Sequence, residues 1–430
     1  MVPAQSCAFV IGISLMFATT STNANELELS LESRFGVDTN VFRRPTGPKA
    51  SRDPNGTDQA TYFELSPQVE IRDADSDSLD YRVRYKGTRS QYLSYSSVTG
   101  WDHEADASGS WRISPVDTLR VGGSYLDRRR RLISLDQVLA ADPGSPDELA
   151  RRASDRQRIR TSGANTSLTH SFNSRTSLTG SYAFNDIDFV PNAGSLTTDT
   201  VDTRAHTASL SPQWVLNSRT SVGLGVTGRF RDNRGIDKLG QANTYVTTGD
   251  FSLQISRQLT KAASLSLNGG PSLIRTETAL PSGSESDELN VSWFAQALFR
   301  QKWEKTTLSV DYSRFESASG GLGTSSIVDE VSIGTTTRLA HHLSVRAVAI
   351  WNQREQLVKN SALTGIPESK VSQIQLSGSI RYQISERISL SARAQYLNQT
   401  NQREPPDRDN ELQMFTAFIA FRYTFEPLDY

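Results

Sequence analysis

The chain is poor in cysteine and has no long apolar run beyond its first residues. Cys7 is the only cysteine among 430 residues, so an internal disulfide and a cysteine-rich zinc site are both excluded. A transmembrane helix needs about twenty consecutive apolar residues, and no segment after residue 24 contains them. The sequence therefore predicts a protein without membrane-spanning helices.

An excess of charge of one sign is also lacking. The chain has 46 Lys and Arg residues against 47 Asp and Glu residues, with a formal net charge of −1. Proteins that bind nucleic acid by neutralising phosphates carry basic stripes, so no nucleic-acid partner is expected. The sequence also lacks phosphate-binding glycine loops, helix-flanked calcium loops and Cys/His clusters. It therefore predicts no metal and no other cofactor.

Histidine, the commonest general base, is scarce. The five histidines are His103, His170, His206, His341 and His342. Two combinations match a catalytic site only weakly. They are His206 with Ser209 and His103 with Asp102. Serine is abundant throughout the chain, and a carboxylate pair of the glycosidase type cannot be recognised while the pairing of strands is unknown. We predict that the protein is not an enzyme.

The first residues resemble a secretory leader. An apolar segment from Ala8 to Ala18 is followed by small polar residues and by "TNA", which predicts cleavage after Ala24. The segment before it has no Lys or Arg, so an alternative start site or a buried first strand stays open. The domains expected are a signal peptide at 1–24 and one large domain at 25–430. The mature chain has no cysteine, which suits the periplasm or outer membrane.

Alternation of apolar and polar residues runs through the rest of the chain. In "TSVGLGVTGRFRD" the apolar residues from Val222 to Phe230 alternate with polar ones that include Arg229 and Arg231. The same period of two recurs at 79–86, 289–299, 374–382 and 415–425. Strands of soluble sheets usually have about five or six residues, whereas these run to about ten or more, the length of a strand that crosses a bilayer.

Turn signals give the number of strands. Eight short turns are expected at 73–78, 114–118, 173–177, 217–221, 259–264, 302–306, 339–344 and 384–389. "NSRTS" occurs at two of them, and "LSPQ" occurs at 65–68 and 210–213. With a strand at each end, the sequence predicts an all-β fold, a transmembrane antiparallel up-and-down β-barrel of about 18 strands, with 16 as the alternative. An even number places both termini on the periplasmic side.

Arginine is frequent on the predicted inner face. The predicted pore-lining residues are Arg82, Arg84, Arg229, Arg231, Arg346, Arg381, Arg393 and Arg422. Guanidinium groups bind carboxylates and phosphates, so the lumen is expected to favour anionic sugars or small anions, unless these arginines are paired structural charges. A barrel of this size encloses water unless it is plugged. The 127–157 loop, with a helix expected after Ser145, either constricts the mouth or lies on the surface.

The start of the predicted mature chain carries a recognisable motif. "RFGVDTNVFRR", with Asp38, Thr39 and Asn40 followed by Val41, resembles the opening of outer-membrane β-barrel porins associated with bacterial exopolysaccharide systems. This resemblance implies a channel or accessory protein that exports exopolysaccharide across the outer membrane. Its implied partners are anionic polysaccharide and polysaccharide export proteins.

The end of the chain resembles the signal that the barrel-assembly machinery recognises. The last alternating segment, "FTAFIAFRYTF", ends in an aromatic residue, and "EPLDY" follows it. Either Phe425 or Tyr430 is then the terminal aromatic. Outer-membrane lipid is the expected surroundings of the barrel.

Three functions stay open from the sequence. Besides exopolysaccharide export, the alternation fits a general diffusion porin for small solutes. It also fits a structural or adhesive barrel whose outer loops bind a ligand.

Overall fold

The computed structural model describes residues 25–39, 59–73, 78–93, 99–129, 158–190, 202–234, 243–279, 285–318, 325–356, 369–403, 410–426 and 428–429. The predicted signal peptide and the helix expected after Ser145 lie outside these ranges, as does the 127–157 loop from residue 130 onward. None of the described segments is a helix long and apolar enough to cross a membrane.

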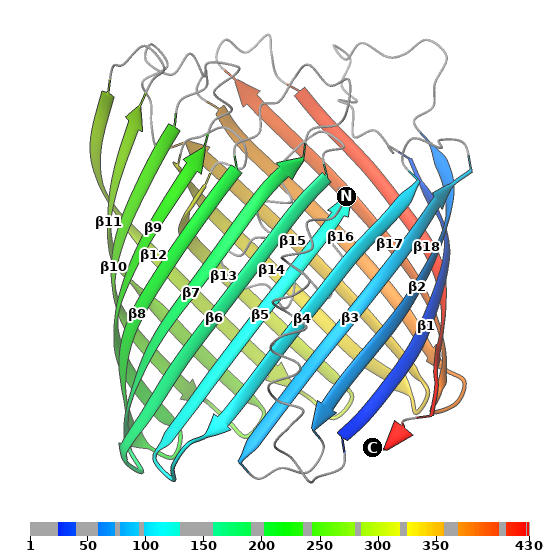
Figure 1. Ribbon diagram of the computed structural model, residues 1–430, viewed down its shortest axis with the longest axis horizontal. Coiled ribbons are helices and arrows are strands. Elements are labelled where there is room, and N and C mark those ends of the chain that lie inside the picture. Colours follow the sequence, from blue (N-terminus) through cyan, green and yellow to red (C-terminus); the bar gives the residue numbers. More distant parts are fainter. Residues whose placement is uncertain are drawn as a thin grey trace.

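Within the described ranges, eighteen long strands close into one barrel (Figure 1). They are β1 (Asn25–Asp38), β2 (Ala60–Asp73), β3 (Leu79–Tyr92), β4 (Gly100–Arg112), β5 (Asp117–Arg129), β6 (Arg158–Asn173), β7 (Thr176–Val190), β8 (Asp202–Asn217), β9 (Thr220–Arg234), β10 (Asn243–Gln258), β11 (Ala263–Ala279), β12 (Glu285–Lys302), β13 (Thr306–Ala318), β14 (Ser325–Ala340), β15 (Leu343–Gln356), β16 (Ser369–Gln383), β17 (Ile388–Arg403) and β18 (Asn410–Thr424). The barrel closes where β1 pairs antiparallel with β18, from Ser30↔Thr424 to Asp38↔Thr416, and a short β19 (Leu428–Asp429) extends that seam. The barrel of about 18 strands predicted from the sequence is confirmed, and the alternative of 16 is wrong.

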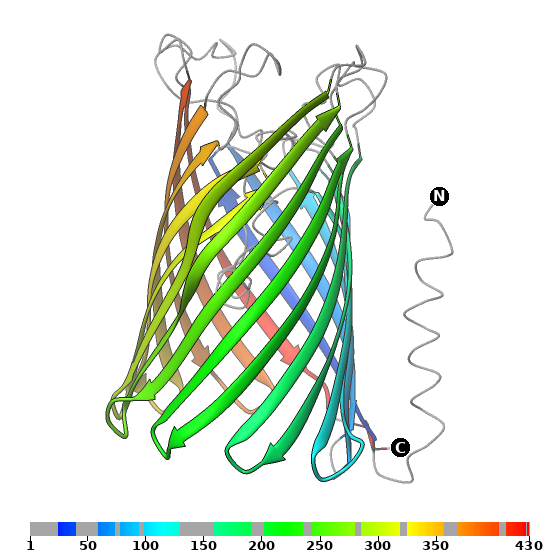
Figure 2. The same ribbon diagram turned by 90° about the vertical axis from the view of Figure 1, so that its left-hand side faces the viewer.

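The two ends of the barrel differ in their connections (Figures 1 and 2). Short turns lie at the end where β1 begins and β18 ends, which we call the turn end. At the opposite end, the loop end, consecutive strands are separated by longer stretches of sequence. Seven of the eight predicted turns are described and join the strands as expected. The eighth joins β2 to β3, and its residues 74–77 lie outside the described ranges.

The repeated "NSRTS" is a turn signal with a clear mechanism. Asn173 Oδ1 accepts a hydrogen bond from the backbone N–H of Arg175 (2.8 Å), and Asn217 Oδ1 accepts one from Arg219 (2.9 Å). Asparagine bonds the backbone two residues ahead in this way in tight turns. The same pentapeptide therefore builds the same turn twice, between β6 and β7 and between β8 and β9.

The repeated "LSPQ" lies inside strands and interrupts the ladder on one side. Pro67 pairs with Leu31 of β1, but pairing with β3 stops at Leu65 and resumes at Gln68. Pro212 pairs with Leu178 of β7, while pairing with β9 skips from Leu210 to Gln213. Proline lacks the N–H that a two-sided ladder needs. Both copies thus mark the same irregularity in equivalent strands.

Apolar and polar side chains separate between the two faces of the wall. On the outer face, Leu224 and Val226 of β9 are half exposed, and Ile419 of β18 is 57% exposed. The inner face carries mostly polar side chains, but it also holds a set of buried apolar ones. That set is Val328, Val348, Ile350, Leu397 and Met414. The inner face is therefore more apolar than alternation alone predicts, on the side of the barrel formed by β14–β18.

The ladder between β12 and β13 is incomplete. It runs only from Ala295↔Arg314 to Lys302↔Thr307, whereas β12 pairs with β11 along its whole length, from Ala263↔Gln301 to Ala279↔Glu285. Above Arg314, β13 continues to pair with β14 up to Ala318↔Ser325. The upper part of this hairpin therefore leaves β12. We call its residues 314–318 and 325–329 the inner hairpin, for reasons given below.

Gly270 of β11 permits a close approach between two strands. A Cβ atom added there would lie 2.0 Å from the carbonyl oxygen of Phe251 on β10. Gly270→Ala is therefore expected to push β10 and β11 apart and to lower the free energy of unfolding by about 1–3 kcal/mol, the usual cost of overpacking. Urea unfolding in lipid vesicles measures this, and Gly249→Ala in β10 is the matched control because its added Cβ meets nothing within 4 Å. Equal stability of the two variants would contradict the close approach.

Candidate functional site

A wall of paired charges lines the inner face of β18, β1, β2, β3 and β4. Its carboxylates are Glu28, Glu32, Glu64, Glu70, Glu104 and Asp106, and its guanidinium groups are Arg34, Arg82, Arg84 and Arg422. We call this set the charged wall. With Lys86, which lies opposite Gln68 and Glu104 on the same face, the two signs nearly balance.

The ladder brings these charges together. Arg84 lies opposite both Glu70 and Asp106, and its guanidinium contacts Asp106 at 2.7 Å and Glu104 at 2.6 Å. Arg82 contacts Glu70 at 2.8 Å. Across the closing seam, Arg422 of β18 reaches Glu28 of β1 at 3.6 Å. Each of these arginines is therefore positioned beside at least one carboxylate.

An aromatic ring is part of the same inner surface. Phe418 of β18 lies opposite Gly36 of β1 and Arg393 of β17. The guanidinium carbons of Arg34 and Arg393 stand 5.1 Å and 5.6 Å from the centre of its ring. Both distances fit cation–π contacts, so the inner surface here combines an aromatic ring with charged groups.

A second cluster joins parts of the wall that are not neighbours. Glu316 of β13 contacts Arg231 of β9 at 2.8 Å and Arg229 at 3.6 Å, and the hydroxyl of Thr248 on β10 donates to it at 3.5 Å. The side chain of Glu316 is 2% exposed and that of Arg231 is 7% exposed. Beside it, Ile327 of β14 is buried with Val246 of β10 and Ile274 of β11. The inner hairpin therefore packs against the inner face of β9–β11.

Exposed arginines gather on the inner face at the turn end. They include Arg112, Arg120, Arg300, Arg338 and Arg381. Arg381 donates to the hydroxyl of Ser389 at 3.4 Å, and none of the ion pairs found among the described residues involves Arg112, Arg120 or Arg381. The turn end of the lumen thus carries several inner-face cations that take part in none of the ion pairs of the described residues.

The structure places the predicted pore-lining residues in different settings. Arg82, Arg84 and Arg422 belong to the charged wall, Arg229 and Arg231 to the Glu316 cluster, Arg393 to the Phe418 contact, and Arg381 to the turn end. Arg346 lies opposite Thr336 and Ser379. That these side chains line a conducting pore stays a prediction.

Sequence reasoning missed several carboxylates of these clusters. Glu28, Glu32 and Glu104 lie at alternating positions that face the same side of the strand as the neighbouring arginines. Their parity in the sequence could therefore have identified them as inner-face residues. Glu316 has the opposite parity: it shares a face with Val310 and Tyr312, which predicts the outer surface. Only the departure of β13 from β12 brings it to Arg231.

The histidines lie away from these charges. His206 hydrogen-bonds Tyr182 at 2.8 Å within a row of outer-face rings that continues to Phe230 and Tyr245. His103 likewise hydrogen-bonds Tyr85 at 2.9 Å. His206 and Ser209 point to opposite faces of β8, and His103 and Asp102 to opposite faces of β4, because successive side chains of a strand alternate. Neither combination forms a catalytic pair, and the described residues contain no metal-binding cluster.

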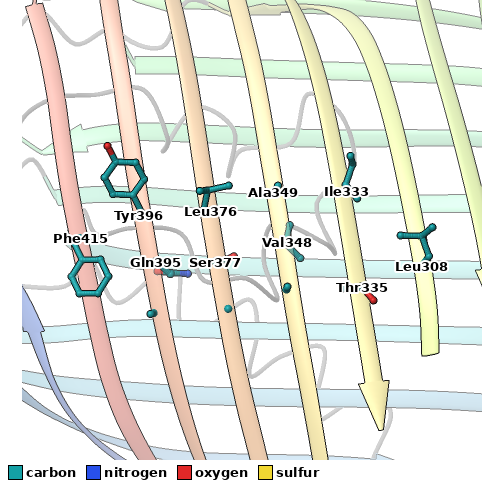
Figure 3. A pocket seen from close by; sticks show the side chains of 13 residues that line it. Leu308, Ile333, Thr335, Val348, Ala349, Leu376, Ser377, Gln395, Tyr396 and Phe415 are labelled. Atoms are coloured by element: carbon teal, nitrogen blue, oxygen red, sulfur yellow. The ribbon is translucent and has the colours of Figure 1, made fainter. Parts of the chain in front are cut away.

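A groove of about 490 Å³ lies on the outer face of β13–β18 (Figure 3). Leu308, Ile333, Leu376, Tyr396 and Phe415 surround it, and small residues of β15–β17 form its floor. None of its lining residues is charged. A charged or strongly polar solute finds no partner there, so the inner face is the candidate site.

Comparison with known proteins gives no family assignment: no family model and no curated protein matches the chain. Among solved structures, it is similar to Pseudomonas aeruginosa OccK2 (OpdF), with 11% identity over 93% of this chain and 98% of that chain and a TM-score of 0.44. It is similar to the siderophore receptor PiuA from Acinetobacter baumannii, with 11% identity over 92% and 82% and a TM-score of 0.47. It is also similar to the unliganded ferric citrate transporter FecA, with 11% identity over 88% and a TM-score of 0.46, and it spans 60% of that chain.

Proposed function

We propose that the chain is an outer-membrane channel through which small polar solutes diffuse. The observation that carries this proposal is the division of the barrel between an exposed apolar outer face and an inner face that holds the charged wall. A closed barrel satisfies its backbone groups within lipid, so the outer face suits a bilayer. The inner charges suit water and charged or hydrogen-bonding solutes.

The same proposal includes an orientation of the barrel in the outer membrane and two partners. Both termini and the turn end face the periplasm, and the loop end faces outward, as in bacterial barrels with short periplasmic turns. Outer-membrane lipid surrounds the apolar face. Phe425, which is 44% exposed and whose backbone N–H donates to Leu29 at 2.8 Å, is the terminal aromatic offered to the barrel-assembly machinery.

Export of exopolysaccharide is a finer proposal that rests on the resemblance of the "DTN" motif. Within that motif, Thr39 closes the barrel: its backbone N–H donates to the carbonyl of Phe415 at 3.0 Å, and its hydroxyl accepts from the N–H of Phe415 at 2.9 Å. Asn40 and the residues after it lie outside the described ranges. The described part of the motif thus contributes to barrel closure, a role that does not depend on which solute the channel carries. We therefore place general diffusion first.

The test is conductance. Expressed with residues 1–24, the predicted signal peptide, the protein is expected in the outer-membrane fraction, and the purified protein is expected to give stepwise currents in planar bilayers. A folded barrel without conductance would favour the structural or adhesive alternative. Recovery of the folded protein from the soluble cytosolic fraction would contradict the membrane location.

A further inference from the structure

The inner hairpin brings a carboxylate to two arginines across the interior of the barrel. Glu316 and Ile327 face each other across the β13–β14 ladder, and both lie on the face that carries Val310 and Ile333 lower down. In the lower part this face is the outer surface. In the upper part it is buried against Arg231, Val246 and Ile274. Toward the loop end the wall therefore overlaps itself, with the inner hairpin of β13 and β14 inside β9–β11 (Figure 2).

The overlap leaves part of β12 without its second neighbour. Residues 285–294 pair with β11 alone, and Leu289 and Val291 are 71% and 73% exposed. A position for the inner hairpin beside β12 is thus available in the ladder, but the hairpin does not occupy it. An unpaired strand edge is costly in a membrane, so contacts inside the lumen must offset part of that cost.

The contacts that hold the hairpin centre on one carboxylate and two guanidinium groups. Glu316 accepts from Arg231 through one oxygen, while its other oxygen lies near Arg229 and Thr248. Among the described residues, Glu316 is the sole carboxylate that contacts Arg229 or Arg231. Two cations facing one anion leave one positive charge in excess, and guanidinium groups bind carboxylates in a fork geometry.

We propose that Arg229, Arg231 and Thr248 form a binding site for the carboxylate group of an anionic solute, and that Glu316 occupies this site from within the chain. The inference deepens the proposed channel function by naming the chemical class of a solute that the lumen binds. Solute and Glu316 compete for the same guanidinium groups, so binding of the solute releases the inner hairpin. When Glu316 occupies the site most of the time, the solute binds only the small vacant fraction. Its apparent affinity is then its intrinsic affinity multiplied by that fraction.

The test measures equilibrium binding of gluconate to the refolded full chain by isothermal titration calorimetry. Sorbitol, which has the same carbon chain with a hydroxymethyl group in place of the carboxylate, is the neutral control ligand. Glu316→Gln removes the competing charge and is expected to lower the dissociation constant for gluconate about tenfold or more, with no binding of sorbitol. Asp311→Asn removes a carboxylate from the inner face of the same strand, opposite Leu298 and Ser332 and outside the ion pairs of the described residues, and it should leave the affinity for gluconate unchanged.

A second variant tests the hairpin without altering the charges. Ile327→Ala empties part of the buried contact with Val246 and Ile274, weakens docking of the hairpin, and should also tighten gluconate binding severalfold. Val348→Ala, another buried inner-face residue, is its control. Adding Arg229→Gln and Arg231→Gln to Glu316→Gln should abolish binding.

Three results would overturn the proposal: equal affinities of wild type and Glu316→Gln, no gain with Ile327→Ala, or binding that survives loss of both arginines. The assay does not depend on conduction. A barrel that binds gluconate without passing current would refute the channel function and leave the site standing. A conducting barrel that fails to bind would do the opposite.

Discussion

Arginine at position 224 is expected to destabilise the barrel strongly, and arginine at position 227 to be tolerated. Leu224 lies on the outer face of β9, 51% exposed and opposite Leu253 of β10. A charged side chain there meets lipid and costs about 2–4 kcal/mol near the bilayer midplane. Thr227 lies on the inner face opposite Asp250, where a new guanidinium gains a carboxylate neighbour and water.

The measurement is reversible urea unfolding of the folded barrel in lipid vesicles, followed by tryptophan fluorescence. The two variants add the same side chain to the same strand, three residues apart, so each is the control for the other. A loss of stability confined to Leu224→Arg supports the assignment of faces. Equal losses would show that the outer face of β9 does not contact lipid.

Much of this architecture could be predicted because its signals are local. Alternation requires only neighbouring residues, and "NSRTS" forms its turn through a bond between residues two apart. Strand number, turn positions and the separation of faces follow from such short-range chemistry. The role of "LSPQ" was less accessible. Proline indicates a missing donor, but the side of the strand on which the ladder breaks depends on the neighbouring strands.

The clusters on the inner face could not be predicted because they depend on register and on long-range packing. Parity places Arg84 inside, yet its contact with Asp106 requires the register between β3 and β4. The position of Glu316 could not be predicted for a stronger reason, because its parity in β13 predicts the outer face. A signal exists in hindsight. The outer apolar run of β12 continues to Leu289, whereas that of β13 ends at Tyr312 and is followed by Arg314 and Glu316.

The arginines on the inner face therefore contribute unequally to the field in the lumen. In the charged wall each guanidinium lies within 3.6 Å of a carboxylate, and opposite charges at such distances largely cancel at longer range. In the Glu316 cluster one positive charge remains. At the turn end, Arg112, Arg120 and Arg381 are exposed and outside the ion pairs of the described residues. The positive field near the turn end should come mainly from these exposed arginines.

Reversing two turn-end charges is accordingly expected to change ion selectivity, while removing a whole ion pair is not. Fixed positive charge along a water-filled lumen raises the local concentration of anions, so the wild-type channel should prefer anions. Arg120→Glu combined with Arg381→Glu should lower the anion-to-cation permeability ratio about twofold or more. The double variant Glu70→Gln and Arg82→Gln removes an ion pair of 2.8 Å without changing net charge, and it should leave that ratio unaltered.

Reversal potentials of single channels in a salt gradient measure the ratio. The preference for anions should fade in concentrated salt because the Debye length, about 10 Å at 0.1 M, shortens. A cation-selective wild-type channel, or a larger effect from the neutral pair than from the turn-end arginines, would mean that the charged wall governs permeation.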